Sequence, residues 1–379
     1  MFELLLKGGH VIDPASGRNE PADVAFDKGR VAVIDRDIEE HQARSTVDVG
    51  GRYVVPGLID LHTHVYWGGT SLGVDADKIA VRSGTTTFID AGSAGAGNLL
   101  GFRKHVIERS RARILAYINV SFAGIFGFSH YLMVGENSDI RMCDARACRD
   151  IAREHTDILC GVKVRVGLVA GGTSGAAPLD IAIESAESLH MPVMAHIDKP
   201  PPSRRQVINR LRPQDVLTHC FKPYPSAPIT ADRTVREEIL AARERGVIFD
   251  IGHGMGSFDF EVARGMIDEG FYPDVISSDI HALNIDGPAY DLLHTMSKFL
   301  ALGLPVMDIV RMASSEPARA IARSDLGRLA PGSVGDAAVL DVRQGRYTFT
   351  DVLGQKMSHN EAFHCDGIVI AGEWMPNSD

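Results

Sequence analysis

The chain has 379 residues, of which 45% are hydrophobic and 23% charged, and it carries a formal charge of -10 at pH 7. This balance is typical of a globular protein with a substantial core, and it excludes a nucleic-acid surface, which needs clustered basic residues. The N-terminus has only a very short apolar run, and no apolar stretch of about 20 residues occurs, so we expect neither a signal peptide nor a membrane anchor. The five cysteines form no CxxC pair and predict no disulfide framework, which suits a cytoplasmic protein.

The first 54 residues predict a β-rich segment. Short apolar runs alternate with turn signals, and Asp27-Lys28-Gly29 has the composition of a hairpin turn. Residues 325–379 have the same texture, with valine and isoleucine pairs set among glycine and aspartate. We therefore expect one small β-sandwich domain built from both chain termini, residues 1–54 and 325–379.

Residues 55–324 show a different pattern, in which strands and helices alternate. Eight β-branched runs are separated by helical segments over about 270 residues. The helical segments have start and stop signals, such as Pro178 in one and Gly246 after another. This rhythm predicts an α/β fold, a (β/α)8 TIM barrel. An open doubly wound sheet is the alternative, but no G-x-G-x-x-G turn follows a strand.

Polar side chains stand at the ends of the predicted barrel strands, where the carboxyl ends of all strands form one face. They are His62 and His64 on the first strand, Lys163 on the fourth, His196 on the fifth, His219 on the sixth and Asp279 on the eighth. A lone histidine at a strand end is usually a hydrogen-bonded core residue. Four on one rim would each need a buried acceptor, so a metal site is the better interpretation.

Lys163 lies in the run GVKVRV, whose alternation taken alone predicts a half-exposed edge strand. In a barrel, the valines pack on the helices while Lys163 and Arg165 point inward. A buried, unpaired ammonium is costly, so Lys163 needs a partner or a changed charge. A neutral amine can react with CO2, and the resulting carbamate has two oxygens that can bridge two metals.

The segments PGLIDLHTH and SSDIHA, together with the inward lysine and the two later histidines, resemble the amidohydrolase superfamily of metal-dependent hydrolases. The resemblance implies that His62, His64 and Asp279 bind one divalent metal, that His196 and His219 bind a second, and that carboxylated Lys163 bridges both. Zinc is the expected metal because imidazole suits it. The resemblance also implies a metal-bridging hydroxide as nucleophile, with Asp279 as the catalytic residue that transfers its proton.

One departure from the family pattern narrows the substrate. Dihydroorotases usually have H-x-H-x-R, whereas this chain has Tyr66 at the arginine position, so the closer resemblance is to the deacetylase branch. Arg165 can clamp a substrate carboxylate or pair with a buried acid, and both interpretations stay open. We also expect Tyr66, Trp67 and His253 to contact substrate. The aromatic loop SFAGIFGFSHYLM can build an apolar pocket or local core.

These features predict deacetylation of a small N-acyl amino acid or O-acyl 2-hydroxy acid. A cyclic amidase of the dihydroorotase or hydantoinase type is the alternative, and a catalytically inactive scaffold ranks last because all six ligand positions are filled. The expected partner is a small acylated acid, with no nucleic acid and no membrane. A homo-oligomer is compatible with the resemblance.

Overall fold

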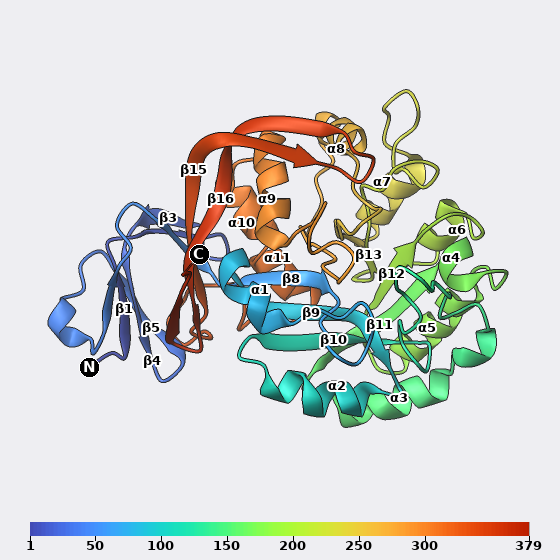
Figure 1. The fold of residues 1–379 in the computed structure, drawn as a ribbon, viewed down its shortest axis with the longest axis horizontal. Coiled ribbons are helices and arrows are strands. Elements are labelled where there is room, and N and C mark those ends of the chain that lie inside the picture. The colour runs from blue at the N-terminus through green and yellow to red at the C-terminus, as the bar shows by residue number, and fades with distance from the viewer. Residues whose placement is uncertain (379) are drawn as a thin grey trace.

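The computed structural model describes residues 1–378, which form a β-rich part and a larger α/β part (Figure 1). Both chain ends lie on the β-rich side of the molecule. Within these residues, no helix combines the length and the apolar character that crossing a membrane requires. The five cysteines are free thiols.

Two β-sheets assembled from both chain ends make up the β-rich part. One has the order β5-β4-β1-β6, with β1 at Leu4–Lys7, β4 at Asp23–Asp27, β5 at Arg30–Asp35 and β6 at Thr46–Asp48. The other has the order β17-β16-β15-β7-β2-β3, with β2 at His10–Asp13, β3 at Arg18–Pro21, β7 at Tyr53–Pro56, β15 at Ala337–Thr350, β16 at Lys356–Ile370 and β17 at Glu373–Pro376. Phe26 of the first sheet and Val54 and Val339 of the second share one buried cluster. The inner faces therefore form a sandwich core, which confirms the predicted architecture.

Lys28 and Gly29 connect β4 to β5 in a two-residue turn. Their φ angles are 51° and 70°, the left-handed values of the type I′ turn, whose twist matches that of the flanking strands. The hairpin predicted at this position is therefore present.

Seven parallel strands in chain order form the curved sheet of the α/β part. They are β8 at Leu58–Thr63, β9 at Thr85–Gly95, β10 at Arg113–Asn119, β11 at Leu159–Val166, β12 at Val193–Ile197, β13 at Val216–Leu217 and β14 at Ile248–Phe249. Nearly all their residues are buried, because one face fills the barrel interior and the other packs beneath helices.

Residues 275–280 take the place of the eighth strand. They form parallel bridges to both neighbours, Asp250 with Val275 on one side and Thr63 with Ile280 on the other. The segment is not a regular strand because Asp279 has a φ of 49°, outside the β region. The barrel is closed all the same, and the predicted (β/α)8 fold is confirmed.

Helices surround the barrel and fill the connections between its strands (Figure 1). They are α1 at Ala76–Ser83, α2 at Leu99–His105, α3 at Ala145–Glu154, α4 at Leu168–Gly171, α5 at Ala177–Glu187, α6 at Arg204–Ile208, α7 at Glu237–Glu244, α8 at Phe260–Asp268, α9 at Leu292–Ala301, α10 at Val306–Met312 and α11 at Ser315–Ala320. Three short 3-10 helices are η1 at Glu40–Gln42, η2 at Ile107–Arg109 and η3 at Ile140–Met142. Pro178 lies in the first turn of α5, and Gly246, with a φ of 88°, follows α7, so both sequence signals mark helix boundaries.

The β15–β16 hairpin extends well beyond the sandwich, and its outer half reaches over α9 toward α8 (Figure 1). At its tip, Val352 N donates to Phe258 O at 3.2 Å, and the Asp351 carboxylate accepts from Phe260 N at 3.1 Å. Residues 325–379 were expected to lie in the sandwich domain, but the tip of this hairpin packs on the barrel. At the other boundary, β7 continues to Pro56, just past residue 54.

Candidate metal and active site

A cavity of about 260 Å³ opens at the carboxyl ends of the barrel strands. Its polar wall consists of His62, His64, Lys163, Arg165, His196, Asp198, His219, Lys222, Ser257, Asp279 and His281. Its other lining residues, mostly apolar, are Leu72, Ile125, Phe128, Met133, Val169, Met255 and Gly256. All six predicted metal ligands thus meet at one mouth.

His62 and His64 face Asp279 across the closure of the barrel. His62 lies in β8 and His64 directly follows its end, and because side chains two apart on an extended chain share a face, both imidazoles point to the same side. Each Nε2 lies 3.3 Å from Asp279 Oδ1, and the potential ligand atoms of the three residues all lie within 4.8 Å of one another. Asp279 Oδ1 is buried and makes no hydrogen bond. A buried acceptor without a donor, beside two imidazole nitrogens, fits a divalent cation.

A hydroxyl and a carboxylate support the His62 ring on its Nδ1 side, opposite the nitrogen that faces Asp279. Thr218 Oγ1 donates to Asp250 Oδ2 at 2.6 Å and lies 2.7 Å from His62 Nδ1. Ser277 Oγ donates to the other Asp250 oxygen at 2.6 Å. Burial keeps the pKa of His62 well below its usual range, so the ring is neutral at pH 7. The network fixes the ring orientation that directs Nε2 to the site.

His64 has an equivalent support on the next strand. Its Nδ1 lies 2.8 Å from Ser93 Oγ, and Ser93 N donates to Asp90 Oδ1 at 2.7 Å. Val65 N donates to the second Asp90 oxygen at 2.9 Å. Burial lowers the pKa of His64 to about 3, so this imidazole is also neutral. His62 and His64 are therefore each supported by a hydroxyl and a buried aspartate.

Lys163 projects from β11 into the barrel and has no exposed surface. Its Nζ lies 3.3 Å from His62 Nε2. Gly92, with a φ of 80°, makes room for it, since a Cβ there would lie 2.6 Å from Lys163 Cβ. Burial lowers the pKa of Lys163 to about 7, so a neutral amine is available near neutral pH.

His196 and His219 form a second group beside the first. Nδ1 of His196 and Nε2 of His219 are 2.6 Å apart. His219 Nδ1 lies 2.7 Å from the Gly252 carbonyl, which selects the tautomer that leaves Nε2 free to accept. His219 has a φ of 66°, a costly backbone conformation that turns its ring toward the site. Burial keeps the pKa of both rings well below the usual range.

The loop after β14 closes around the first group of ligands. Gly254 has a φ of 56°, and a Cβ there would lie 2.3 Å from Asp279 Oδ2. His253 N and Gly254 N donate to the carbonyls of Ser277 and Ser278 at 3.2 and 3.0 Å. The backbone of this loop therefore seats Asp279.

Arg165 lines the cavity on the same strand as Lys163. Its Nη1 is 3.4 Å from Glu136 Oε2, and its guanidinium lies 5.1 Å from the centre of the Phe128 ring. The Glu136 side chain is buried, and its Oε1 makes no hydrogen bond. Arg165 therefore shows the pairing with a buried acid, and it also lines the cavity; its role toward a substrate carboxylate stays a prediction.

Three residues expected to contact substrate lie outside the cavity lining. Tyr66 is buried against Phe102, with ring centroids 4.6 Å apart, and donates to Asn98 O at 3.2 Å. Trp67 is 55% exposed and does not line the cavity. His253 is fully buried, and its Nε2 accepts from Lys298 Nζ at 2.7 Å. Those expectations do not fit the structure, because Tyr66 and His253 are engaged by other residues and Trp67 lies on the surface.

The aromatic loop after β10 was expected to build either an apolar pocket or local core, and only part of it lines the cavity. Phe128 lines the cavity, whereas Phe126 and Tyr131 are 61% and 100% exposed. Lys222 and Asp198 also line the cavity, although neither was among the predicted site residues. Both follow strand-end histidines by only two or three residues, and that proximity is the signal by which they could have been found.

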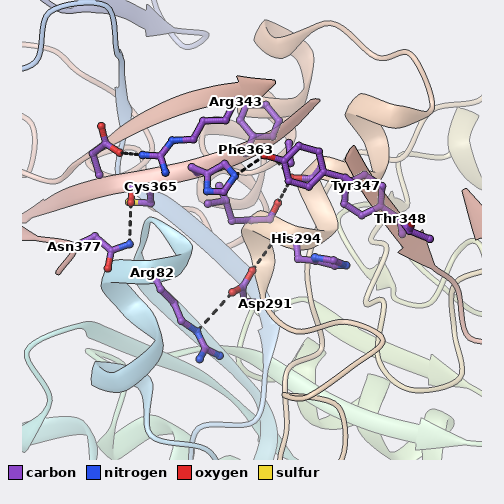
Figure 2. Close-up of a pocket in the computed structure, with 15 residues that line it drawn as sticks. Arg82, Asp291, His294, Arg343, Tyr347, Thr348, Phe363, Cys365 and Asn377 are labelled. Atoms are coloured by element: carbon purple, nitrogen blue, oxygen red, sulfur yellow. Dashed lines mark hydrogen bonds and ion pairs between the residues drawn. The ribbon is translucent and has the colours of Figure 1, made fainter. Parts of the chain in front are cut away.

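A second cavity, of about 410 Å³, lies between the β15–β16 hairpin and α9 (Figure 2). Its charged side chains already pair with one another. Arg82 lies 3.6 Å from Asp291, and Arg343 donates to Asp366 at 2.7 Å. The barrel mouth differs, because there the potential ligand atoms of His62, His64 and Asp279 lie within 4.8 Å of one another.

Comparison with known proteins identifies the family. A profile of the Amidohydrolase family matches residues 53–375. The chain belongs to this family. This amidohydrolase is 32% identical over 345 residues to a deacetylase of Brucella anthropi, covering 91% of this chain and 85% of the relative. A solved structure described as an adenine deaminase matches it with a TM-score of 0.92 and 28% identity over 100% of both chains. Another, described as a dihydroorotase, gives a TM-score of 0.89 and 30% identity over 99% of each chain.

The chain is therefore a metal-dependent hydrolase on an amidohydrolase barrel. Amidohydrolases generally bind divalent metals, and the His62, His64 and Asp279 group suits such an ion.

Proposed function

We propose that this amidohydrolase removes the acyl group from a small N-acyl amino acid or O-acyl 2-hydroxy acid. The observation that carries the proposal is one cavity lined both by the predicted metal ligands, with neutral imidazoles, and by apolar side chains. A deacetylase with 32% identity over 91% of the chain supports the same reaction class.

Two divalent ions, for which zinc is the best candidate, would be held by the two groups of ligands. His62, His64 and Asp279 would bind the first, and His196 and His219 the second. The orphaned Asp279 Oδ1 and the neutral imidazoles support this assignment, because metal ligands must be unprotonated. When bound, such ions lower the pKa of a coordinated water and polarise an acyl carbonyl.

Lys163 would complete the site as a carbamate formed with CO2. Reaction with CO2 needs a neutral amine, and the lowered pKa of Lys163 supplies one. Its position next to His62, at 3.3 Å, would bring the carbamate oxygens into the range of both ligand groups. The modification converts a costly buried cation into an anion that two metals stabilise.

Asp279 would transfer the proton. It lies on the cavity wall with one oxygen free of hydrogen bonds, so it can accept a proton from the attacking water. The same carboxylic acid then protonates the leaving nitrogen or oxygen. Water adds to the acyl carbon, the bond to nitrogen or oxygen breaks, and acetate and the free acid leave.

A cyclic amidase is the second candidate, because a solved structure at 30% identity is described as a dihydroorotase. Two features of this chain weigh against it. Tyr66 stands where the dihydroorotase pattern has arginine, and its ring is committed to Phe102 rather than to the cavity. The open apolar wall, with Phe128 and Met133, suits an aryl or other bulky side chain.

The test is a substrate panel with purified, metal-loaded enzyme. It would compare N-acetyl amino acids and O-acetyl 2-hydroxy acids carrying aromatic side chains with dihydroorotate, hydantoins and adenine. We expect the highest kcat/KM among the acyl acids, and loss of activity after chelation. Faster turnover of the cyclic amides or of adenine would contradict the proposal. Elemental analysis of the wild type and of the His62→Ala, His64→Ala double variant would test the metal assignment separately.

A further inference from the structure

Three basic side chains line the catalytic cavity, and each has different surroundings. Lys163 adjoins the metal-ligand histidines. Arg165 has the buried acid Glu136 at 3.4 Å and the face of Phe128 beside it. Lys222 differs from Arg165, because within residues 1–378 no carboxylate oxygen lies within 4.0 Å of its Nζ, and it differs from Lys163 because its Nζ contacts no metal-ligand histidine.

Lys222 nevertheless has a defined position. Its main-chain N donates to His219 O at 3.2 Å, so the lysine follows a candidate metal ligand by one turn. Nζ donates to Ser257 Oγ at 2.9 Å and lies 3.5 Å from Gly256 O. One short hydrogen bond and one long contact leave an ammonium with unused donor capacity. Ser257 is buried, and it also lines the cavity.

We propose that Lys222 Nζ and Ser257 Oγ form the subsite that binds the carboxylate of the substrate. This inference rests on the proposed deacylation and extends it to the substrate's second functional group. A carboxylate placed here would accept from the ammonium and from the hydroxyl, and would give Lys222 an acid in direct contact, whereas Asp198 and Asp279 line the same cavity beyond 4.0 Å from its Nζ.

Arg165 is the less suitable anchor, although the sequence points to it. Its charge is already opposed by Glu136, and its guanidinium lies against Phe128. A substrate carboxylate beside Arg165 would be repelled by the Glu136 carboxylate. Lys222 offers a positive charge with no such competitor in contact.

Burial also shapes the chemistry of the subsite. Lys222 and the buried Ser257 both line the cavity, where little water can screen a charge. A bound carboxylate favours the charged form of a nearby amine. The subsite therefore selects acids over their neutral amides, because a neutral carboxamide cannot balance the ammonium.

Binding is tested with probes that cannot be hydrolysed. N-methanesulfonyl-phenylalanine lacks a cleavable acyl bond, and its carboxamide is the neutral counterpart. Racemates avoid a choice of enantiomer. Calorimetry on metal-loaded protein would measure Kd for both probes with wild type, Lys222→Met, Lys222→Arg and Ser257→Ala.

Loss of a desolvated charge pair predicts that Lys222→Met raises Kd for the acid roughly 30-fold or more, while Kd for the carboxamide changes less than about 3-fold. Lys222→Arg, which keeps the charge, should retain part of the preference for the acid. Lys199→Met is the matched control, because Lys199 is exposed and does not line the cavity. Near-UV circular dichroism of each variant would verify folding.

Turnover provides the second measurement. For N-acetyl-phenylalanine and its carboxamide, Lys222→Met should remove the preference of kcat/KM for the acid, and Lys199→Met should preserve it. An unchanged preference in Lys222→Met, or a wild type that binds acid and carboxamide equally, would overturn the inference. If wild type binds the acid probe through Lys222 but hydrolyses none of the acyl acids, the proposed function fails while the carboxylate subsite stands.

Discussion

The amine of Lys163 lies 3.3 Å from Nε2 of His62 at the centre of the barrel mouth. A protonated lysine there would compete with a metal for the same imidazole. Because burial brings the pKa of Lys163 to about 7, the amine can lose its proton and react with CO2 under ordinary conditions.

Replacement of this lysine should therefore empty the site. We expect Lys163→Ala to lose metal and nearly all activity, with partial recovery when acetate or propionate replaces the carbamate. Metal analysis and initial rates would measure both effects, with exposed Lys199→Ala as the control. Full metal content in Lys163→Ala would contradict the bridging role.

The Thr218 hydroxyl, between Asp250 and His62, should contribute to metal affinity. Thr218→Val keeps the shape and removes the hydrogen bond, so we expect metal binding to weaken about 10- to 100-fold. Thr295→Val is a matched control, since Thr295 is also buried and donates to Asp291 O, and it does not line the cavity. Competition with a metal indicator would measure the affinities. Equal losses in the two variants would indicate a general packing effect.

Asp279→Asn tests proton transfer. Removal of a general base should lower kcat about 100- to 10,000-fold, with a much smaller change in KM. Metal content must be measured on the same samples, because Asp279 is also a candidate ligand. Near-normal kcat with full metal content would assign the proton transfer to another group.

Gly254→Ala should disturb the same carboxylate without removing it. The new Cβ would lie 2.3 Å from Asp279 Oδ2, on a backbone with a φ of 56°. We expect kcat to fall at least about tenfold, because misplaced catalytic groups lose much of their effect. Gly171→Ala is the comparison, since a Cβ there would meet nothing within 4 Å. A fully active Gly254→Ala enzyme would show that Asp279 tolerates displacement.

Lys298 gives a prediction about stability and pH. Its Nζ contacts His253 Nε2 and the carbonyls of Pro288 and Thr350, so Lys298→Met should cost about 2 to 4 kcal/mol of unfolding free energy. Burial lowers its folded-state pKa from 10.5 to about 7, so between these values the unfolded chain binds the extra proton. The lysine's contribution to stability is lost as pH falls toward 7. Urea unfolding should show that the difference in unfolding free energy between wild type and Lys298→Met widens from pH 7 to pH 8.5. A difference that narrows over this range would mean that the carbonyls keep the lysine charged in the folded protein.

The metal-ligand residues could be predicted because the end of a β-strand can be recognised in the sequence alone, where an apolar run stops at a polar residue. His62, Lys163 and His219 each terminate or interrupt an apolar run, and the barrel topology brings such positions to one rim. Asp250 ends a similar apolar run, so the sequence also indicated a functional position for this residue behind His62, although it was not among the predicted site residues.

Loop side chains could not be placed in this way. Tyr66 and His253 sit near the rim in sequence, yet packing against Phe102 and Phe258 turns them from the cavity. Their direction depends on partners distant in the chain, which local pattern does not specify. The outer part of the β15–β16 hairpin was missed for the same reason, since its alternation suits a sandwich strand and a cover over α9 equally well.

The pairing of β7 with β15 has a consequence for synthesis on the ribosome. About 280 residues separate Pro56 from Ala337, so at roughly 5 to 20 residues per second the N-terminal strands wait about 15 to 55 s for their partner. During that interval β7 has only β2 beside it and exposes an unpaired edge. Nascent chains stalled before residue 337 should therefore be the form most prone to aggregation and most dependent on chaperones.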